Sequence, residues 1–128
     1  MGVIRSFRDL TVYQRAKAEA KEIFECTRTY PKAETYALTD QIRRSSRAVG
    51  ALIAEAWARR RYEAAFINKL NEALGEAMET QAWLDHALDC RYLNNDQFNK
   101  LDQAWQEIGA MLNGMIEKAG SFCPSVPK

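Results

Sequence analysis

The side chains best suited to chemistry in this 128-residue chain are arginines, which fall into two groups. The groups are Arg43, Arg44 and Arg47, then Arg59, Arg60 and Arg61. A guanidinium group binds phosphate oxygens through paired hydrogen bonds, so these six are the candidate nucleic-acid-binding residues. The same residues also fit a solvated surface on which Glu55 and Glu63 neutralise them. Both interpretations stay open on the residues alone.

A metal site or a catalytic site has little support. His86 is the single histidine and Cys90 follows it at i+4, but a structural zinc site needs four ligands. A di-iron bundle needs Glu-x-x-His on two helices, and Glu72, Glu76 and Glu79 are expected to face outward. There is no glycine-rich phosphate loop. We therefore predict no enzyme activity, no metal and no cofactor.

The composition narrows the class of partner. The formal net charge is +1, with 18 basic and 17 acidic residues, so nucleic acid would have to bind a local basic patch. Cys26, Cys90 and Cys123 are odd in number and lack metal-type spacing, which indicates reduced thiols in a cytoplasmic protein. No apolar run is long enough to cross a membrane, and we expect no membrane partner.

The hydrophobic periodicity predicts four helices, at about residues 11–30, 34–59, 62–90 and 94–119, with the start of the second anywhere between 34 and 39. Thr11 with Gln14, and Asn94 with Gln97, match the capping-box pattern at two of the helix starts. Residues 1–128 form one domain in this prediction, with a core over 7–119, a loose leader at 1–6 and a loose tail at 120–128. Short connectors between amphipathic helices favour an all-α, up-down-up-down antiparallel four-helix bundle.

The first and fourth helices differ in how cleanly their inward stripes repeat. The fourth shows the clearest repeat, with Phe98, Leu101, Trp105, Ile108, Leu112, Met115 and Ala119. The stripe predicted for the first helix has one poor fit, Lys17, among Leu10, Tyr13, Lys17, Ala20, Phe24 and Thr27.

Two features point away from the predicted core and suggest contact between subunits. Opposite the apolar stripe of the second helix lie small residues, namely Gly50, Ala51, Ala54 and Ala58. They fit either alanine's helix preference or a neighbouring subunit packed there. Trp83 is expected on the outer side of the third helix, and tryptophan is enriched in interfaces. One such patch on each side of a subunit is what a closed ring requires.

Several short motifs occur in the order and spacing of a known family. The chain has F-R-D-L-T-V-Y-Q from residue 7, Q-I-R-R-S-S from 41, I-A-E-A from 53, F-I-N-K-L from 66 and E-x-x-E-T-x-x-W-L from 76. Over residues 7–116 these resemble the bacterial four-helix bundle proteins named after intervening sequences in 23S ribosomal RNA genes. Leu52 and Ala56 stand where that family usually has Asn and Gly.

The resemblance implies an antiparallel bundle that assembles into a ring, typically a homopentamer. A related group serves as accessory proteins to reverse transcriptases in diversity-generating retroelements, which implies RNA, DNA or a reverse-transcriptase-like protein as partner. The family offers no catalytic residue to carry over. We therefore expect a non-catalytic homo-oligomer associated with nucleic acid or a nucleic-acid enzyme. The alternative is an oligomeric protein-interaction scaffold that binds no nucleic acid.

Overall fold

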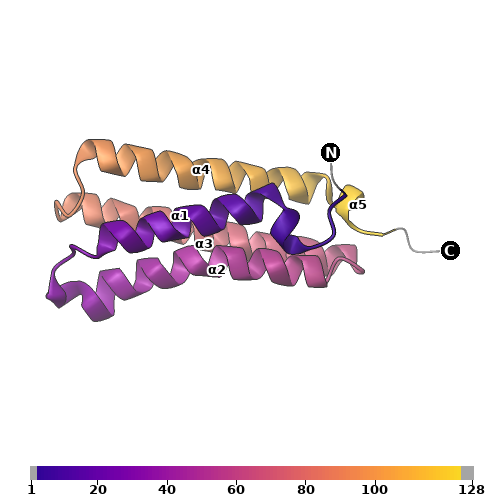
Figure 1. The fold of residues 1–128 in the computed structure, drawn as a ribbon, viewed down its shortest axis with the longest axis horizontal. Helices are drawn as coiled ribbons and strands as arrows, with labels where there is room; N and C mark the ends of the chain where they lie inside the picture. Colours follow the sequence, from indigo (N-terminus) through magenta and orange to yellow (C-terminus); the bar gives the residue numbers. More distant parts are fainter. Residues whose placement is uncertain (1–2, 125–128) are drawn as a thin grey trace.

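Helices account for all the regular structure in the computed structural model, which describes residues 3–124. Four of them are long, namely α1 (Thr11–Thr27), α2 (Asp40–Ala58), α3 (Glu63–Asp89) and α4 (Asn95–Glu117). They lie side by side along one long axis (Figure 1), and α1 packs on both α2 and α4 while α3 packs on α2 and α4. The prediction of an all-α fold is confirmed.

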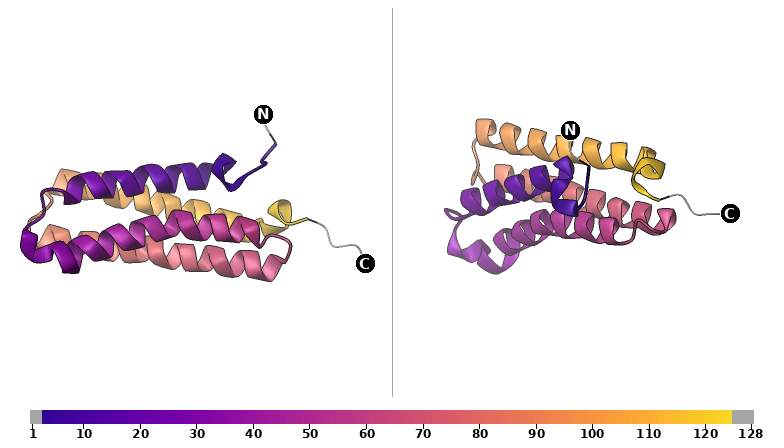
Figure 2. Two further views of the ribbon diagram at one scale, coloured as in Figure 1. Left: turned by 60° about the horizontal axis from the view of Figure 1, so that its bottom comes forward. Right: turned by 45° about the vertical axis from the view of Figure 1, so that its right-hand side comes forward.

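Short helical elements precede α1, fill the connection from α1 to α2 and follow α4. These are the 3-10 turns η1 (Phe7–Asp9) and η2 (Lys32–Glu34), the π turn η3 (Thr35–Thr39) and the short helix α5 (Ala119–Phe122). Figure 2 shows that η1 and α5 lie at the end of the bundle where α2 joins α3. The other two connections between long helices lie at the opposite end.

One of the two predicted capping boxes is present. Asn94 accepts from the backbone of Gln97, and the Gln97 side chain accepts from the backbone of Asn94, at the start of α4. The box predicted at Thr11 is wrong, because η1 precedes α1 and Leu10 becomes the residue before the helix. Gln14 instead donates to the Arg8 carbonyl at 2.9 Å.

The predicted loose tail and leader need correction where the structure describes them. Residues 120–122 belong to α5, and the Phe122 ring stacks on buried Phe66 at 6.0 Å between centroids. At the other end, Ser6 and Asp9 form a capping box on η1. Residues 1–2 of the predicted leader and 125–128 of the predicted tail lie outside the described residues.

The core confirms the stripe of the fourth helix and corrects that of the first. Trp105, Ile108 and Leu112 on α4 are fully buried. Leu10, Ala20 and Thr27 of the stripe predicted for α1 are buried, but Tyr13, Lys17 and Phe24 are replaced in the core by Val12, Ala16 and Ile23, one residue earlier in each case. Lys17 is exposed, and Tyr13 and Phe24 are half-buried. The small Ala16 and Ala20 provide the close contacts, which leaves the larger side chains of α1 at the edge.

Candidate nucleic-acid interface

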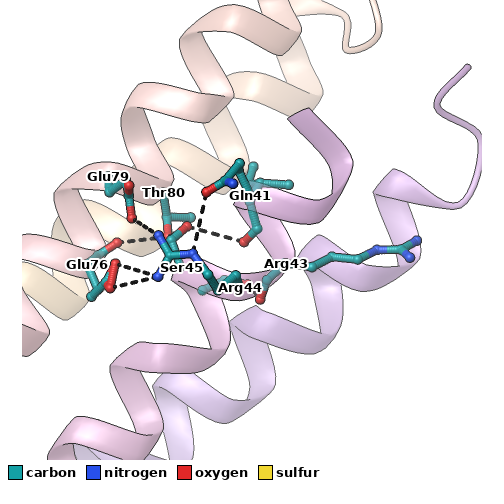
Figure 3. A network of polar contacts seen from close by, with 9 residues as sticks. Gln41, Arg43, Arg44, Ser45, Glu76, Glu79 and Thr80 are labelled. Atoms are coloured by element: carbon teal, nitrogen blue, oxygen red, sulfur yellow. Dashed lines mark hydrogen bonds and ion pairs between the residues drawn. The ribbon is translucent and has the colours of Figure 1, made fainter. Parts of the chain in front are cut away.

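The flank of α2 that faces α3 holds Arg44 in a closed polar network (Figure 3). Its guanidinium donates to Glu79 at 2.6 Å and to Glu76 at 3.3 Å. Beside it the hydroxyls of Ser45 and Thr80 lie 2.8 Å apart, and both residues are fully buried. Glu76 and Glu79 thus face Arg44 rather than only solvent. Because the charge of Arg44 is already paired, we no longer count it among the candidate phosphate-binding residues.

The pKa values of Arg44 and Glu76 are both raised, but only that of Arg44 is raised by the ion pair. The hydrogen bond to Glu76 raises the pKa of Arg44, as expected for a paired cation. The pKa of Glu76 is also raised, chiefly because burial disfavours its charged form and then because Glu79 hydrogen-bonds to it. Burial of the Glu76 carboxyl therefore outweighs the attraction of Arg44.

The opposite flank of α2 faces α1 and leaves its arginines without acidic partners. Arg43 donates from Nε to the Thr27 hydroxyl at 2.8 Å, and its guanidinium lies 4.6 Å from the centroid of the Phe24 ring. The Arg47 guanidinium lies 5.4 Å from the same centroid. In Figure 3 Arg43 points away from Glu76 and Glu79. Within residues 3–124 neither arginine forms an ion pair with a carboxylate.

A groove of about 450 Å³ runs between α1 and α2 on this flank, and we name it the α1/α2 groove. It is lined by Phe7, Tyr13, Ala16, Lys17, Ala20, Lys21, Phe24, Ser46, Arg47, Gly50, Ala51 and Ala54. Three of these side chains are basic and none is acidic. Three others are aromatic, and the rest are small. The groove therefore combines a cationic rim, aromatic walls and a floor that leaves room for a ligand.

The small residues predicted as a subunit interface lie in two places. Gly50, Ala51 and Ala54 line the α1/α2 groove, whereas Ala58 lines a second hollow at the end of α2. Gly50 was expected to point away from the core but is buried, and a Cβ there would lie 3.5 Å from the Tyr13 ring. The expectation failed because it assigned no side chain of α1 to this flank.

The second arginine group lies at the turn between α2 and α3, apart from the groove. The Arg60 guanidinium lies 3.9 Å from the centroid of the Trp57 ring and donates to the Trp57 carbonyl at 2.8 Å. Arg60 and Arg61 line the second hollow, of about 650 Å³, and Arg59 is exposed. The structure therefore does not gather the six predicted arginines into one site.

Trp83 does not stand out from the surface as expected. It is half-buried and packs against the core, because buried Thr80, Leu84 and Ala87 surround its position on α3. Its indole N–H is buried and has no hydrogen-bond partner, and its ring centroid lies 5.6 Å from that of His86. Most of the tryptophan surface is thus used within its own subunit.

The sequence prediction missed the α1 contribution to the groove. Lys17, Lys21, Tyr13 and Phe24 were either assigned to the core or left aside. The poor fit of Lys17 in the predicted stripe was the available signal. Within residues 3–124 no group of three or more His, Cys, Asp or Glu side chains is placed to hold a metal ion. None of the helices described is both long and apolar enough to span a bilayer.

Comparison with known proteins places this geometry in a family. The family model described as 23S rRNA-intervening sequence protein matches residues 8–114. The chain belongs to this family. A crystal structure from Bacteroides thetaiotaomicron, of a protein with unknown function from the S23 ribosomal protein family, is 31% identical with a TM-score of 0.75. The match covers 83% of this chain and 95% of that one. No curated protein matches the chain.

Two of the motifs behind the family resemblance meet in the polar network of Figure 3. Gln41, Arg44 and Ser45 come from the Q-I-R-R-S-S segment, and Glu76, Glu79 and Thr80 come from the E-x-x-E-T segment. In this family member the motifs therefore join α2 to α3. Of the first motif, Arg43 and Ser46 are directed to the α1 flank, where Arg43 stacks on Phe24 and Ser46 lines the groove.

Proposed function

We propose that this protein is a non-catalytic, homo-oligomeric helical bundle that binds nucleic acid through the α1/α2 groove. The observation that carries the proposal is a groove with Lys17, Lys21 and Arg47 in its lining and no acidic side chain. Phosphate contacts from Lys and Arg supply most of the affinity in non-specific nucleic-acid binding. The chain as a whole is nearly neutral, so such a local excess of positive charge is what binding would require.

The arginines of this flank are held in position before any ligand arrives. Arg43 and Arg47 both stack on Phe24, and Arg43 is also fixed by Thr27. A guanidinium held by an aromatic ring loses less conformational freedom when it binds a phosphate. A protein that carries nucleic acid, such as a reverse-transcriptase-like enzyme, would bring the same phosphates to this flank. We place this activity in the cytoplasm, in keeping with the cysteine content.

A salt series tests the proposal. The affinity of the purified protein for a labelled oligonucleotide would be measured by fluorescence anisotropy for the wild type and for a Lys17→Gln, Lys21→Gln, Arg47→Gln triple variant. Binding should weaken steeply with salt because counterions are released. The triple variant should flatten the logarithmic salt slope by about 2 for a single strand, or roughly 0.7 for each lost contact.

Arg44→Gln is the matched control, because it removes one positive charge from the paired flank of α2. It should leave the affinity nearly unchanged. A triple glutamine variant of Arg59, Arg60 and Arg61 measures what the arginine run adds beyond the groove. Absence of binding at low salt would contradict the proposal and leave the protein-interaction scaffold as the better account. A loss of affinity in Arg44→Gln as large as that in the triple groove variant would also contradict the proposal.

The oligomeric part of the proposal is supported by a different surface. Along the outer face of α3, exposed residues recur at helical spacing without a charge, namely Ala64, Asn68, Asn71, Gly75, Met78 and Ala82. Interfaces between subunits are depleted in charged residues and enriched in methionine. Met78 is 58% exposed, which is unusual for a large apolar side chain. We propose that this face, rather than Trp83, is one of the two surfaces that a ring requires, and that five subunits form the ring as the family resemblance implies.

Light scattering tests the assembly. The mass should be several times 14.6 kDa, with five subunits expected, and Met78→Glu should lower it without loss of helicity. Tyr62→Glu is the matched control, because Tyr62 is also exposed and apolar but lies at the α2–α3 turn. A wild-type monomer at micromolar concentration would contradict the oligomer.

A further inference from the structure

We propose that the α1/α2 groove is specific for single-stranded nucleic acid, with bases inside the groove and phosphates along its basic rim. The inference rests on the proposed function and deepens it by naming the class of ligand. Its support comes from the concave shape of the groove, its aromatic walls and the position of its charges.

Shape is the first argument. The groove encloses about 450 Å³, which lies within the range of about 300–1,000 Å³ for small-molecule pockets. It therefore has room for a nucleobase above the floor made by Ala20, Gly50 and Ala54. A duplex presents its base edges only inside its own grooves, which a protruding protein element must enter. A concave surface meets a duplex at the backbone alone, so only an unpaired strand can use the interior.

The walls supply the second argument. Tyr13 and Phe24 are half-buried rather than buried, and both line the groove. Phe7 packs edge-on against Tyr13, with 4.9 Å between centroids, and holds that ring in place. Bases of any sequence stack on aromatic side chains. Because Arg43 and Arg47 already lie over the Phe24 ring, a base would stack on Tyr13 and on the outer plane of the Arg47 guanidinium. Aromatic walls at the edge of a core contribute nothing to duplex binding, but they suit splayed bases.

The charges supply the third argument. Lys17 and Lys21 lie one helical turn apart on α1, and Arg47 faces them from α2. The lysines are exposed, so a backbone that follows the groove passes their ammonium groups while its bases turn inward. An acidic peptide would match the charges too, but it would leave the aromatic walls without planar partners.

Fluorescence anisotropy with a labelled oligo(dT) strand, free or annealed to oligo(dA), tests the inference. The wild type should bind the single strand about tenfold more tightly than the duplex, as stacking of one base predicts. Ala54→Leu fills the floor and keeps every charge. It should bring single-strand affinity down to the duplex level while leaving the salt slope unchanged.

Ala51→Leu provides a second filling variant at a more exposed position, where folding is least at risk. Ala110→Leu on α4, exposed and outside both the groove and the proposed subunit interface, is the matched control and should keep the single-strand preference. Equal wild-type affinity for both ligands, or a preference that survives both filling variants, would overturn the inference and leave salt-dependent binding intact. No binding of either ligand would overturn the proposed function as well.

Discussion

Helix α2 packs on α3 along one flank and on α1 along the other, and the two flanks use their polar residues differently. Toward α3, Arg44 is paired with Glu76 and Glu79, above the buried contact between Ser45 and Thr80. Toward α1, Arg43 and Arg47 stack on Phe24 beside an open groove. Arg43 and Arg44 are adjacent in sequence, yet only Arg44 is paired with carboxylates. The neighbouring helix, not the residue type, decides whether a cationic side chain is structural.

The largest expected effect comes from adding the same side chain to each flank. Ser45→Leu should destabilise the protein by about 1–3 kcal/mol, because it adds volume to a closely packed site. Thr80 keeps its own hydrogen bond to the Glu76 carbonyl, so the cost arises mainly from crowding. Ala54→Leu should change stability by less than about 0.5 kcal/mol, as is usual away from packed sites. Urea unfolding followed by circular dichroism measures both.

The comparison of Ser45→Leu with Ala54→Leu could also contradict the difference between the two flanks. If Ala54→Leu destabilises the protein as much as Ser45→Leu does, the α1 flank is packed as tightly as the α3 flank. The groove would then be closed in solution, and the functional proposals built on it would lose their basis. The other outcome, in which Ser45→Leu is tolerated, would mean that the Ser45–Thr80 contact is loosely packed.

A smaller loss of stability is expected when the arginines of the two flanks are replaced. Arg44→Gln should lower stability by about 0.5–1 kcal/mol, because the half-exposed pair is screened by solvent and leaves two carboxylates close together. The loss should shrink as salt is added. Arg47→Gln should change stability less, because no carboxylate depends on it. Thermal unfolding of both variants at low and high salt compares the flanks, and a salt-insensitive loss at Arg44 would count against ion pairing there.

The contrast between α4 and α1 explains how much the sequence could predict. The stripe of α4 contains no basic residue, and its inward residues were assigned correctly around Trp105. In α1 the aromatic Tyr13 and Phe24 were assigned to the core, although the adjacent Val12 and Ile23 are buried in their place. Taking Ala16 rather than Lys17 as the inward residue would have placed Lys17 beside Lys21 on the surface and removed the misfit.

The Arg44 network and the α1/α2 groove depend on contacts between helices, which the hydrophobic periodicity of a single helix does not reveal. Helical spacing indicates the direction of each arginine on α2, but not which side chain of a neighbouring helix will meet it. The pairing of Arg44 with Glu76 and Glu79 spans more than thirty residues of sequence. In the same way, the burial of Gly50 follows from Tyr13 on another helix. The all-α fold needed only local patterns, whereas the groove needed the relative rotation of α1 and α2.

The smallest expected effect is a change in how stability depends on pH. It shows whether burial of Glu76 or its pairing with Arg44 dominates on the α3 flank. Burial raises the pKa of Glu76, so the folded state holds this proton more tightly than the unfolded chain does. Its contribution to stability is therefore present below the ordinary carboxyl pKa and is lost as pH rises through the folded value. Glu107 has the opposite sign, because the hydrogen bond from Arg15 lowers its pKa. Its contribution is present at neutral pH and is lost on acidification.

Glu76→Gln should accordingly change neutral-pH stability by no more than about 0.5 kcal/mol, within the range of ordinary surface substitutions. Relative to the wild type, the variant should become less stable as the pH falls toward about 4, because it lacks the group that gains a proton. Glu107→Gln should show its deficit at neutral pH instead and lose it on acidification. Urea unfolding at several pH values measures both trends. If Glu76→Gln costs more at neutral pH than at low pH, attraction to Arg44 outweighs burial, and the α3 flank is held by charge rather than by packing.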